Sequence, residues 1–251
     1  MNFERLIPPA LAWRLNRKKR EAAETALFRG FYSRFLKPGD LCFDIGANLG
    51  NRVRGFRALD CRVVALEPQS SCFAALQRGF GNDSGVTLIK KAVGRAPGEL
   101  ELRVSKDHVL SSFSEDFIRR TTESGRFATS KWERRETCMV TTLDELIAVH
   151  GVPDFVKIDV EGFEPDVLAG LSTAMPALSI EWVPEMPENA RSCIRHLATL
   201  GEYEFNVSWG ESMKFSRKEW RSVDSILNFT DELSDETTLF GDIYARLKPS
   251  R

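Results

Sequence analysis

Two acidic residues stand at the ends of consecutive apolar runs, and a glycine-containing turn follows the first of them. Residues 41–50 are typical of a buried strand that carries Asp44 near its end and passes through Gly46 and Gly50 into a helix. Glu67 closes the next apolar run, 23 residues after Asp44. Ligands of open parallel sheets bind at the carboxyl ends of the strands, where glycine lets a ligand approach the backbone and a carboxylate accepts ribose hydroxyls. This spacing predicts a site for a nucleoside-containing cofactor.

The position of Asp44 distinguishes two cofactors. Dinucleotide sites use the pattern G-x-G-x-x-G, in which backbone amides face a pyrophosphate, whereas this chain has D-x-G-x-x-x-G at 44–50. A carboxylate so close to the first glycine would repel a pyrophosphate and attract a cationic, sulfonium-bearing amino acid. The sign of the charge favours S-adenosylmethionine over NAD, and a nicotinamide oxidoreductase is the alternative.

The third apolar run, 86–93, is predicted to form the next strand and to end where an adenine ring would lie. Ala92 and Val93 stand at its end. They either cover the ring or fill the core beside it, and the pattern favours neither interpretation.

A second group of acids follows a later strand. Residues two apart in a strand face the same way, so Lys157, Asp159 and Glu161 are predicted to project on one side. A lysine inside a strand requires a paired charge, which Asp159 or Glu181 can supply. The group is either a structural ion-pair network or a lining of the active site. Carboxylates also suit a magnesium ion, but the neighbouring lysine charge leads us to expect no metal.

Alternating strands and helices must position these residues. The pattern predicts an α/β fold with a mostly parallel sheet that is covered by helices on both faces. Residues 1–40, with a helix at 21–36, are expected to form an N-terminal helical extension of a domain at 41–251. Residues 99–104 alternate polar and apolar and are expected to extend the sheet edge, with 137–142 as partner. The segment 108–136 is too long for an ordinary connection between two elements, so it is expected to be functional or mobile. A short helix is predicted near 218–225. The predicted strands are 41–46, 62–67, 86–93, 155–160, 177–183, 203–209 and 242–247, and the predicted helices are 51–59, 71–80, 143–149, 164–171 and 188–200.

The overall composition excludes several classes. Thirty-five basic and 36 acidic residues give a net charge of -1, which does not suggest a nucleic-acid partner. The start of the chain does not resemble a secretory signal, and no apolar run has the roughly 20 residues of a membrane helix. The basic run at 14–20 fits a solvated helix face better than a membrane or polyanion contact. Five cysteines without a Cys-x-x-Cys pair indicate neither disulfides nor zinc, and a cytoplasmic location fits best.

Six motifs, in chain order, resemble the FkbM-type S-adenosylmethionine-dependent methyltransferases. The resemblance runs from about residue 41 to 183 and is most specific in the fifth motif. It implies a class I methyltransferase fold, Rossmann-like, with a seven-stranded sheet whose last strand, 242–247, is antiparallel. It also implies O-methylation of a hydroxyl on a sugar or a polyketide-like natural product. The motifs are DIGANLGNR (44–52), ALEP (65–68), KAVG (91–94), TTLDEL (141–146), DFVKIDVEGFEPDVLAGL (154–171) and SIEW (179–182).

The resemblance assigns roles to individual residues. Asp44, Gly46, Asn48 and Gly50 are expected to hold the methionine part of the cofactor, and Glu67 its ribose. Asp159 is expected beside the sulfonium and the acceptor. The segments outside the resemblance are expected to shape the acceptor pocket or contacts in a homo-oligomer. The remaining expected cofactor contacts are Ile45, Ala47, Asn51, Pro68, Ala92, Val93 and Ser112.

Transfer to a hydroxyl benefits from a general base, because an alcohol is a poor nucleophile. The candidates are Asp159, Glu161 and His108, the last of which lies in the long segment 108–136. A lone histidine in a loop is also compatible with simple exposure to solvent. A member of the family that binds the cofactor without catalysis is a further alternative.

Overall fold

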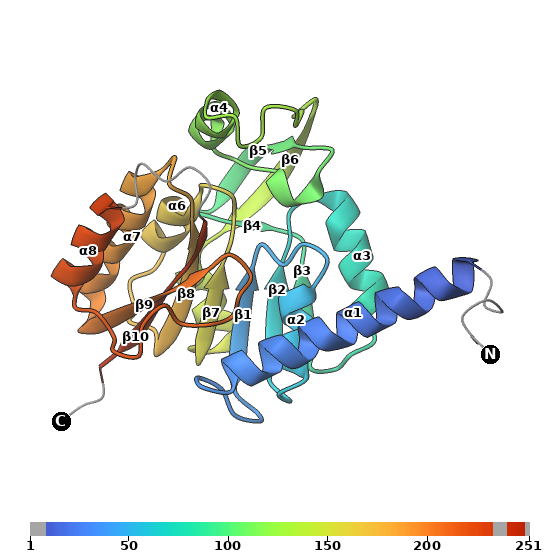
Figure 1. The fold of residues 1–251 in the computed structure, drawn as a ribbon, viewed down its shortest axis with the longest axis horizontal. Helices are drawn as coiled ribbons and strands as arrows, with labels where there is room; N and C mark the ends of the chain where they lie inside the picture. Colours follow the sequence, from blue (N-terminus) through green and yellow to red (C-terminus); the bar gives the residue numbers. More distant parts are fainter. Residues whose placement is uncertain (1–8, 233–239, 249–251) are drawn as a thin grey trace, which may run out of the picture.

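The computed structural model describes residues 9–232 and 240–248, and a seven-stranded sheet forms its centre (Figure 1). The strands are β1 (Leu41–Ile45), β2 (Arg62–Leu66), β3 (Val86–Ile89), β7 (Phe155–Ile158), β8 (Ala177–Trp182), β9 (Tyr203–Trp209) and β10 (Gly241–Leu247). Their order is β3-β2-β1-β7-β8-β10-β9. All neighbours pair in parallel except β10, which is antiparallel to both β8 and β9. This is the predicted class I methyltransferase sheet, including its antiparallel last strand.

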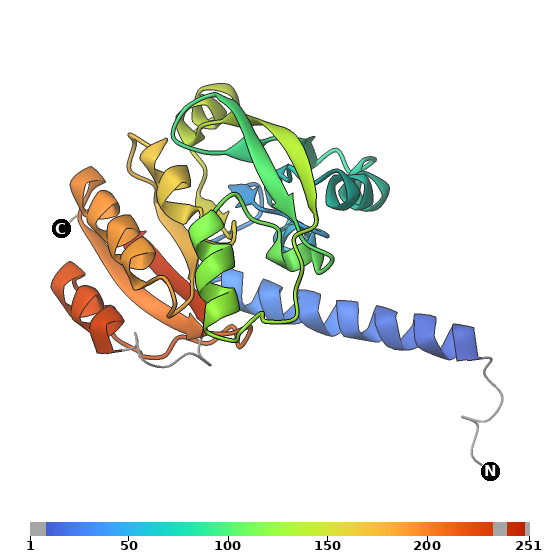
Figure 2. The same cartoon turned by 90° about the horizontal axis from the view of Figure 1, so that it is seen from above.

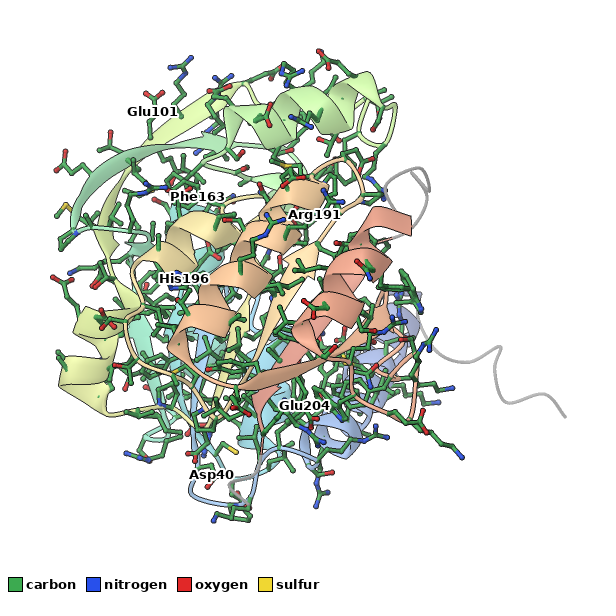
Figure 3. All side chains as sticks on the ribbon, turned by 90° about the vertical axis from the view of Figure 1, so that its left-hand side faces the viewer. Asp40, Glu101, Phe163, Arg191, His196 and Glu204 are labelled. Atoms are coloured by element: carbon green, nitrogen blue, oxygen red, sulfur yellow. The ribbon has the colours of Figure 1, made fainter. Side chains whose placement is uncertain are left out.

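Helices cover both faces of this sheet. One face carries α1 (Pro9–Tyr32), α2 (Asn51–Arg57) and α3 (Ser70–Phe80). The other carries α5 (Leu143–His150), α6 (Glu164–Ala169), α7 (Pro187–Leu200) and α8 (Val223–Glu232). Figure 3 shows α7 and α8 side by side, with Arg191 and His196 on α7 and Phe163 at the start of α6. The imidazole Nε2 of His196 lies 2.9 Å from the carbonyl oxygen of Leu171 and links α7 to the segment before β8.

The central strands are buried on both faces, as expected from their continuous apolar sequence. All five residues of β1 are buried, including Asp44. Phe43 and Ile45 belong to the core beneath α5–α8, whereas Cys42 belongs to the core beneath α1–α3. The five cysteines are free and buried, so the expected absence of a disulfide framework is confirmed for these positions.

A second, three-stranded sheet corrects two of our predictions. Residues 86–93 do not form one strand: β3 ends at Ile89, and β4 (Ala92–Val93) pairs instead with β6 (Arg134–Thr141). β5 (Gly98–Val104) pairs antiparallel with β6 in the order β4-β6-β5 and does not extend the main sheet (Figure 2). Lys90 and Lys91 interrupt the apolar run between the strands, so that the chain can leave the main sheet. A local pattern predicts a strand but does not reveal which sheet it joins.

The long segment 108–136 and the region between β9 and β10 also contain helices. Within 108–136 lie the 3₁₀ turn η2 (His108–Leu110) and α4 (Glu115–Glu123), whose first turn is capped by Ser114 Oγ accepting from the Phe117 amide at 3.1 Å. The helix predicted at 218–225 begins later, because α8 spans Val223–Glu232. Residues 233–239 and residues 1–8 of the expected N-terminal extension lie outside the described part of the chain.

The C-terminal half of α1 is part of the core. Phe28, Phe31 and Tyr32 are at most 2% exposed. The Phe31 ring lies 4.9 Å from that of Phe215 and 5.0 Å from that of Tyr244, centroid to centroid. Aromatic pairs at this spacing add to the burial of apolar surface. Among the helices that the structure describes, none is long and apolar enough to cross a membrane.

Replacing Phe31 with alanine tests whether α1 stabilises the whole fold. Phe31→Ala removes a ring that is buried among aromatic neighbours, so the free energy of unfolding should fall by about 3–5 kcal/mol in chemical denaturation. Leu27→Ala on the same helix is the control, because Leu27 is 43% exposed and should cost less than about 1 kcal/mol. Equal losses in the two variants would contradict this packing.

Candidate active site

A cleft opens at the carboxyl ends of β1, β2 and β7 and is bounded on its far side by β5 and η2. It encloses about 910 Å³ of empty space, open solvent included. Both groups of acids that the sequence singles out contribute to its walls. The lining residues are Gly46, Ala47, Asn48, Leu49, Asn51, Arg52, Glu67, Pro68, Gln69, Leu102, His108, Val109, Ser111, Phe113, Lys157, Asp159, Val160, Glu161 and Glu211.

The glycine turn after β1 is held at a fixed distance from the strand beside it. Gly46 has φ +82°, and a Cβ atom there would lie 1.9 Å from the carbonyl oxygen of Asp159. The amides of Gly46 and Ala47 both donate to the carbonyl oxygen of Leu66, at 3.0 and 2.9 Å. Only glycine is compatible with both the positive φ and the close approach. The turn therefore packs directly against the backbone of Asp159, and its residues 46–48 line the cleft; we call this turn the cradle.

Glu67 lies at the end of β2 and faces the cleft. Its carboxylate accepts hydrogen bonds from the backbone amides of Asn48 and Gln69, both at 2.8 Å, and the residue is 6% exposed. Burial raises the pKa of Glu67 to about 7, although the two amides act in the opposite direction. The carboxylate is thus fixed in place at the position where ribose hydroxyls were expected.

Asp44 lies in the floor below the cleft and is not among the residues that line it. It is fully buried, and within the described part of the chain neither of its oxygens has a hydrogen-bond partner. Burial raises its pKa, while the charges of Lys157 and Arg52 lower it. An orphaned buried carboxylate and the Gly46 cradle are what a cationic, nucleoside-containing cofactor requires, so the residues present fit S-adenosylmethionine.

Lys157 connects the two groups of acids. It is 4% exposed, is paired in register with Asp44 across β1 and β7, and donates from Nζ to Asp159 Oδ2 at 2.5 Å. Burial alone would lower the pKa of a lysine, but the charges of Asp159 and Asp44 raise that of Lys157. Burial would likewise raise the pKa of Asp159, but the ammonium group holds it below its usual value. Lys157 and Asp159 therefore form a charged pair.

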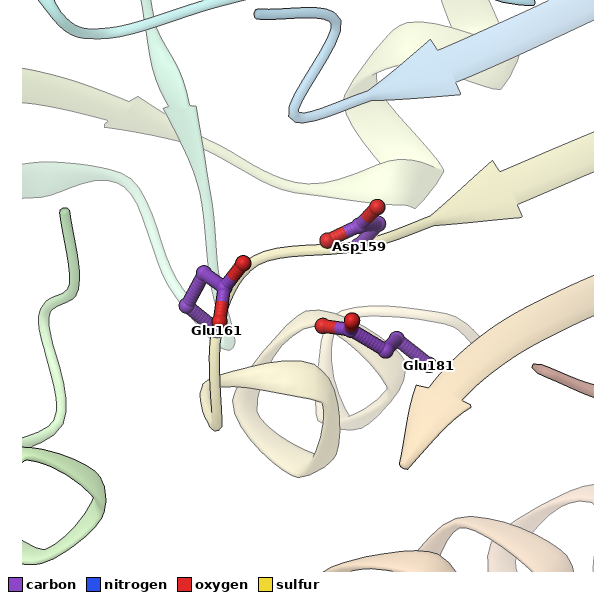
Figure 4. A group of neighbouring side chains, drawn as sticks. All are labelled: Asp159, Glu161 and Glu181. Carbon is purple, nitrogen blue, oxygen red and sulfur yellow. The ribbon is translucent and has the colours of Figure 1, made fainter. Parts of the chain in front are cut away.

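Glu161 and Glu181 complete a group of three carboxylates with Asp159. One oxygen from each lies within 4.8 Å of the others (Figure 4). Burial and the charge of Asp159 raise the pKa of both glutamates well above its usual value. The ionised Asp159 beside them therefore makes ionisation of either glutamate less favourable than in water. Ser112 Oγ donates to the carbonyl oxygen of Glu161 at 2.6 Å and fixes the turn.

The structure brings together most of the residues singled out in the sequence. Two charged residues of the cleft were not predicted: Arg52, which follows the glycine turn directly, and Glu211, which lies in a segment without a recognisable pattern. For Lys157 the sequence left open a structural ion pair and a place in the active-site lining, and the structure shows it both paired with Asp159 and lining the cleft. Of the predicted site residues, Gly46, Ala47, Asn48, Asn51, Glu67, Pro68, His108, Asp159 and Glu161 line the cleft, whereas Asp44, Ile45, Gly50, Ala92, Val93 and Ser112 do not.

Gly46→Ala should remove the cradle. The new Cβ would overlap a backbone oxygen, and the positive φ alone costs an L-residue roughly 1–2 kcal/mol. We expect binding of S-adenosylhomocysteine, the demethylated form of the expected cofactor, to weaken at least about 100-fold in calorimetry. Gly39→Ala is the matched control, because Gly39 has φ +89° but nothing within 4 Å of the added atom. Wild-type affinity in Gly46→Ala would refute the cradle.

The affinity for S-adenosylhomocysteine should depend on pH through Glu67. The raised pKa means that the carboxylate is protonated below about pH 7, and it accepts ribose hydroxyls best when ionised. Affinity should therefore increase with pH up to about 7, by up to about tenfold per unit, and then level off. Calorimetry from pH 5.5 to 8.5 measures this. Glu67→Gln should bind S-adenosylhomocysteine more weakly and with an affinity that no longer depends on pH. If the affinity of this variant still depended on pH as in the wild type, the dependence would come from another group.

The chain matches one protein-family model and is similar in structure to several solved proteins. The model of the methyltransferase FkbM domain matches residues 44–223. Similar solved structures include precorrin-6y C5,15-methyltransferase from Geobacter metallireducens, with 13% identity, a TM-score of 0.46, and 91% of this chain and 86% of that one covered. A TehB-like SAM-dependent methyltransferase from Corynebacterium glutamicum has 8% identity and a TM-score of 0.45, covering 95% of this chain and 100% of that one.

Magnesium protoporphyrin IX methyltransferase from Synechocystis, solved with bound S-adenosylmethionine, has 8% identity and a TM-score of 0.43, covering 92% of this chain and 81% of that one. No curated protein is detectably similar to the chain. The domain match spans more than half of the 251 residues and contains both the glycine turn and the acidic group. The chain therefore belongs to the FkbM family and is an S-adenosylmethionine-dependent methyltransferase.

Proposed function

We propose that the protein O-methylates a hydroxyl group of a small molecule, a sugar or a polyketide-like natural product. The observation that carries this proposal is the contact between the glycine turn and the acidic group, since Gly46 abuts the backbone of Asp159 in one cleft. A cofactor seated on the turn lies beside the carboxylates. A hydroxyl that donates to these carboxylates is then positioned next to the methyl donor.

The residues of the cleft divide into two groups with different tasks. Glu67 and the 46–48 turn orient the cofactor, which supplies an activated methyl group when bound. Asp159 accepts a hydrogen bond from the acceptor hydroxyl. Lys157 keeps Asp159 ionised and directs its carboxylate, because its ammonium group occupies one of the two oxygens.

The reaction also requires a group that takes the hydroxyl proton. A bond from the acceptor oxygen to the methyl carbon forms, the bond from sulfur to that carbon breaks, and the proton leaves the hydroxyl. Glu161 is the proton acceptor in our proposal, since its pKa is raised and its carboxylate is the stronger base once ionised. His108 lies across the cleft, where its carbonyl oxygen accepts from Asn48 Nδ2 at 3.4 Å. It contributes to enclosure of the reactants.

A small hydroxylated acceptor suits the rest of the cleft. The walls combine acids and amides with the apolar side chains of Leu102, Val109 and Phe113, a mixture that fits the polar and apolar faces of a sugar or a polyketide. The near-neutral net charge does not favour a nucleic acid. Glu211, from the region outside the motif resemblance, also lines the cleft, which supports a role of that region in shaping the acceptor pocket.

Asp159→Asn and Glu161→Gln separate chemistry from cofactor binding. We expect each to reduce turnover by about 100-fold or more, because orientation and proton acceptance are lost, while affinity for S-adenosylhomocysteine changes by less than about threefold. Turnover is measured as formation of S-adenosylhomocysteine with a panel of sugars and polyketides as acceptors. Asp166→Asn is the control, since its carboxylate pairs with Arg95 and does not line the cleft.

Normal turnover in both variants would refute the assigned roles of the acids. Failure of the wild-type protein to methylate any acceptor, despite tight binding of the cofactor, would instead favour a member that binds without catalysis. If the protein methylated the nitrogen of amine analogues but not the corresponding hydroxyl compounds, the result would contradict O-methylation and leave methyl transfer itself intact.

A further inference from the structure

Arg52 occupies an unusual position in the cleft. It lies in the first turn of α2, is 8% exposed and lines the cleft. Its guanidinium carbon lies 4.1 Å from the centroid of the Phe28 ring on α1. One nitrogen, Nη2, donates to Glu211 Oε2 at 2.6 Å, whereas the buried Nε has no hydrogen-bond partner among the described residues. The guanidinium group is thus fixed in place, but not all of its hydrogen-bond donors have partners among the described residues.

The two partners of this ion pair differ in their access to water. The side chain of Glu211 is 66% exposed, so its carboxylate can return to solvent at little cost. Arg52 is buried, and its positive charge needs a counter-ion wherever Glu211 goes. Six other titratable groups act on Arg52 through their charge or share its surroundings, and none has a hydrogen bond to it among the described residues: Asp44, Asp159, Asp242, Tyr32, Tyr244 and Lys157. An incoming anion can therefore replace Glu211 as the counter-ion of Arg52.

The chemistry of the site favours a carboxylate. Guanidinium groups bind carboxylates through two parallel N–H donors, and Glu211 leaves one donor of Arg52 unused. The cleft already contains Glu67, Asp159 and Glu161. A singly charged, planar carboxylate adds less repulsion to these acids than a doubly charged phosphate does.

We propose that Arg52 is a carboxylate-binding residue of the cleft and that Glu211 is an internal anion, which the carboxylate of a ligand displaces. This rests on the proposed function, because it specifies one group of a ligand of the same cleft. The carboxylate belongs either to the amino-acid end of the cofactor or to an acidic acceptor such as a sugar acid. In both cases Glu211 competes with the ligand for the same guanidinium.

Binding measurements on Arg52→Met and Glu211→Gln test the exchange. If the cofactor supplies the carboxylate, Arg52→Met should weaken S-adenosylhomocysteine binding by about 10- to 100-fold. Glu211→Gln should tighten it severalfold, because the competitor is gone. Decarboxylated S-adenosylmethionine, which lacks the group, should respond to neither change. Glu101→Gln on β5 (Figure 3) is the matched control, as Glu101 is also exposed and paired with an arginine, Arg135, at 2.6 Å.

A second arm identifies an acceptor carboxylate. Here the probe is glucuronate, titrated into protein saturated with S-adenosylhomocysteine. If the acceptor supplies the carboxylate, glucuronate should bind the wild type, and it should bind more tightly to Glu211→Gln and more weakly to Arg52→Met. The affinity for S-adenosylhomocysteine should then be the same in both variants as in the wild type. Glucose, which has no carboxylate, should not respond to either substitution.

The proposal is overturned if neither probe responds, or if Glu211→Gln weakens binding of both probes, as a purely structural pair would. Thermal melting checks the fold of Arg52→Met. If that variant unfolds, the direction of the Glu211→Gln effect decides alone, since an exposed side chain can be changed without loss of the core. The assay measures binding and not turnover, so its failure is distinguishable from a failure of O-methylation.

Discussion

A single buried lysine makes the acidic side of the cleft physically possible. Lys157 lies in a strand that is buried on both faces, between Asp44 on the neighbouring strand and Asp159 at its own end. Asp44 is fully buried, and Asp159, Glu161 and Glu181 are partly buried close to one another, so ionisation of all four together is unfavourable because each charge loses hydration and repels the others. The ammonium group of Lys157 allows Asp159 to remain charged, and that charge helps to raise the pKa of Glu161 and Glu181. One ion pair thus gives neighbouring acids different pKa values, which is the usual basis for dividing acid and base tasks.

The second constraint is geometric and links the cofactor side of the cleft to the acceptor side. The glycine turn and the acidic turn follow adjacent parallel strands, and they touch where Gly46 meets the carbonyl of Asp159. Backbone hydrogen bonds hold both turns: the amides of Gly46 and Ala47 donate to Leu66 at the end of β2, and the amide of Asp159 donates to Ile45 at the end of β1. In the proposed reaction, the spacing of neighbouring strands, about 4.8 Å, therefore helps to set the distance between the methyl donor and its acceptor.

The sequence predicted the main sheet well because its strands are short, apolar and separated by clear helices. It predicted the second sheet poorly. The run 86–93 is continuous in the sequence, yet its two halves belong to different sheets. The expected pairing of 99–104 with 137–142 is found between β5 and β6, but in the second sheet and not at the edge of the main one. Strand patterns record which faces are buried, and they contain no information on which partner buries them. The start of α8 was missed for a related reason, since its stability comes from packing on α7 and β9.

The sequence by itself determined the cofactor chemistry of this methyltransferase: Asp44 before Gly46, Glu67 one strand later and the 157–161 acids are local patterns, and parallel strands bring their ends to one edge. Only the tertiary structure decided how these groups are charged and which of them face the cleft. Asp44 lies beneath the cleft instead of lining it, and Arg52 meets Glu211 from 159 residues away. Burial and long-range pairing set both outcomes, because desolvation and counter-ions depend on the whole fold and not on neighbours in the chain.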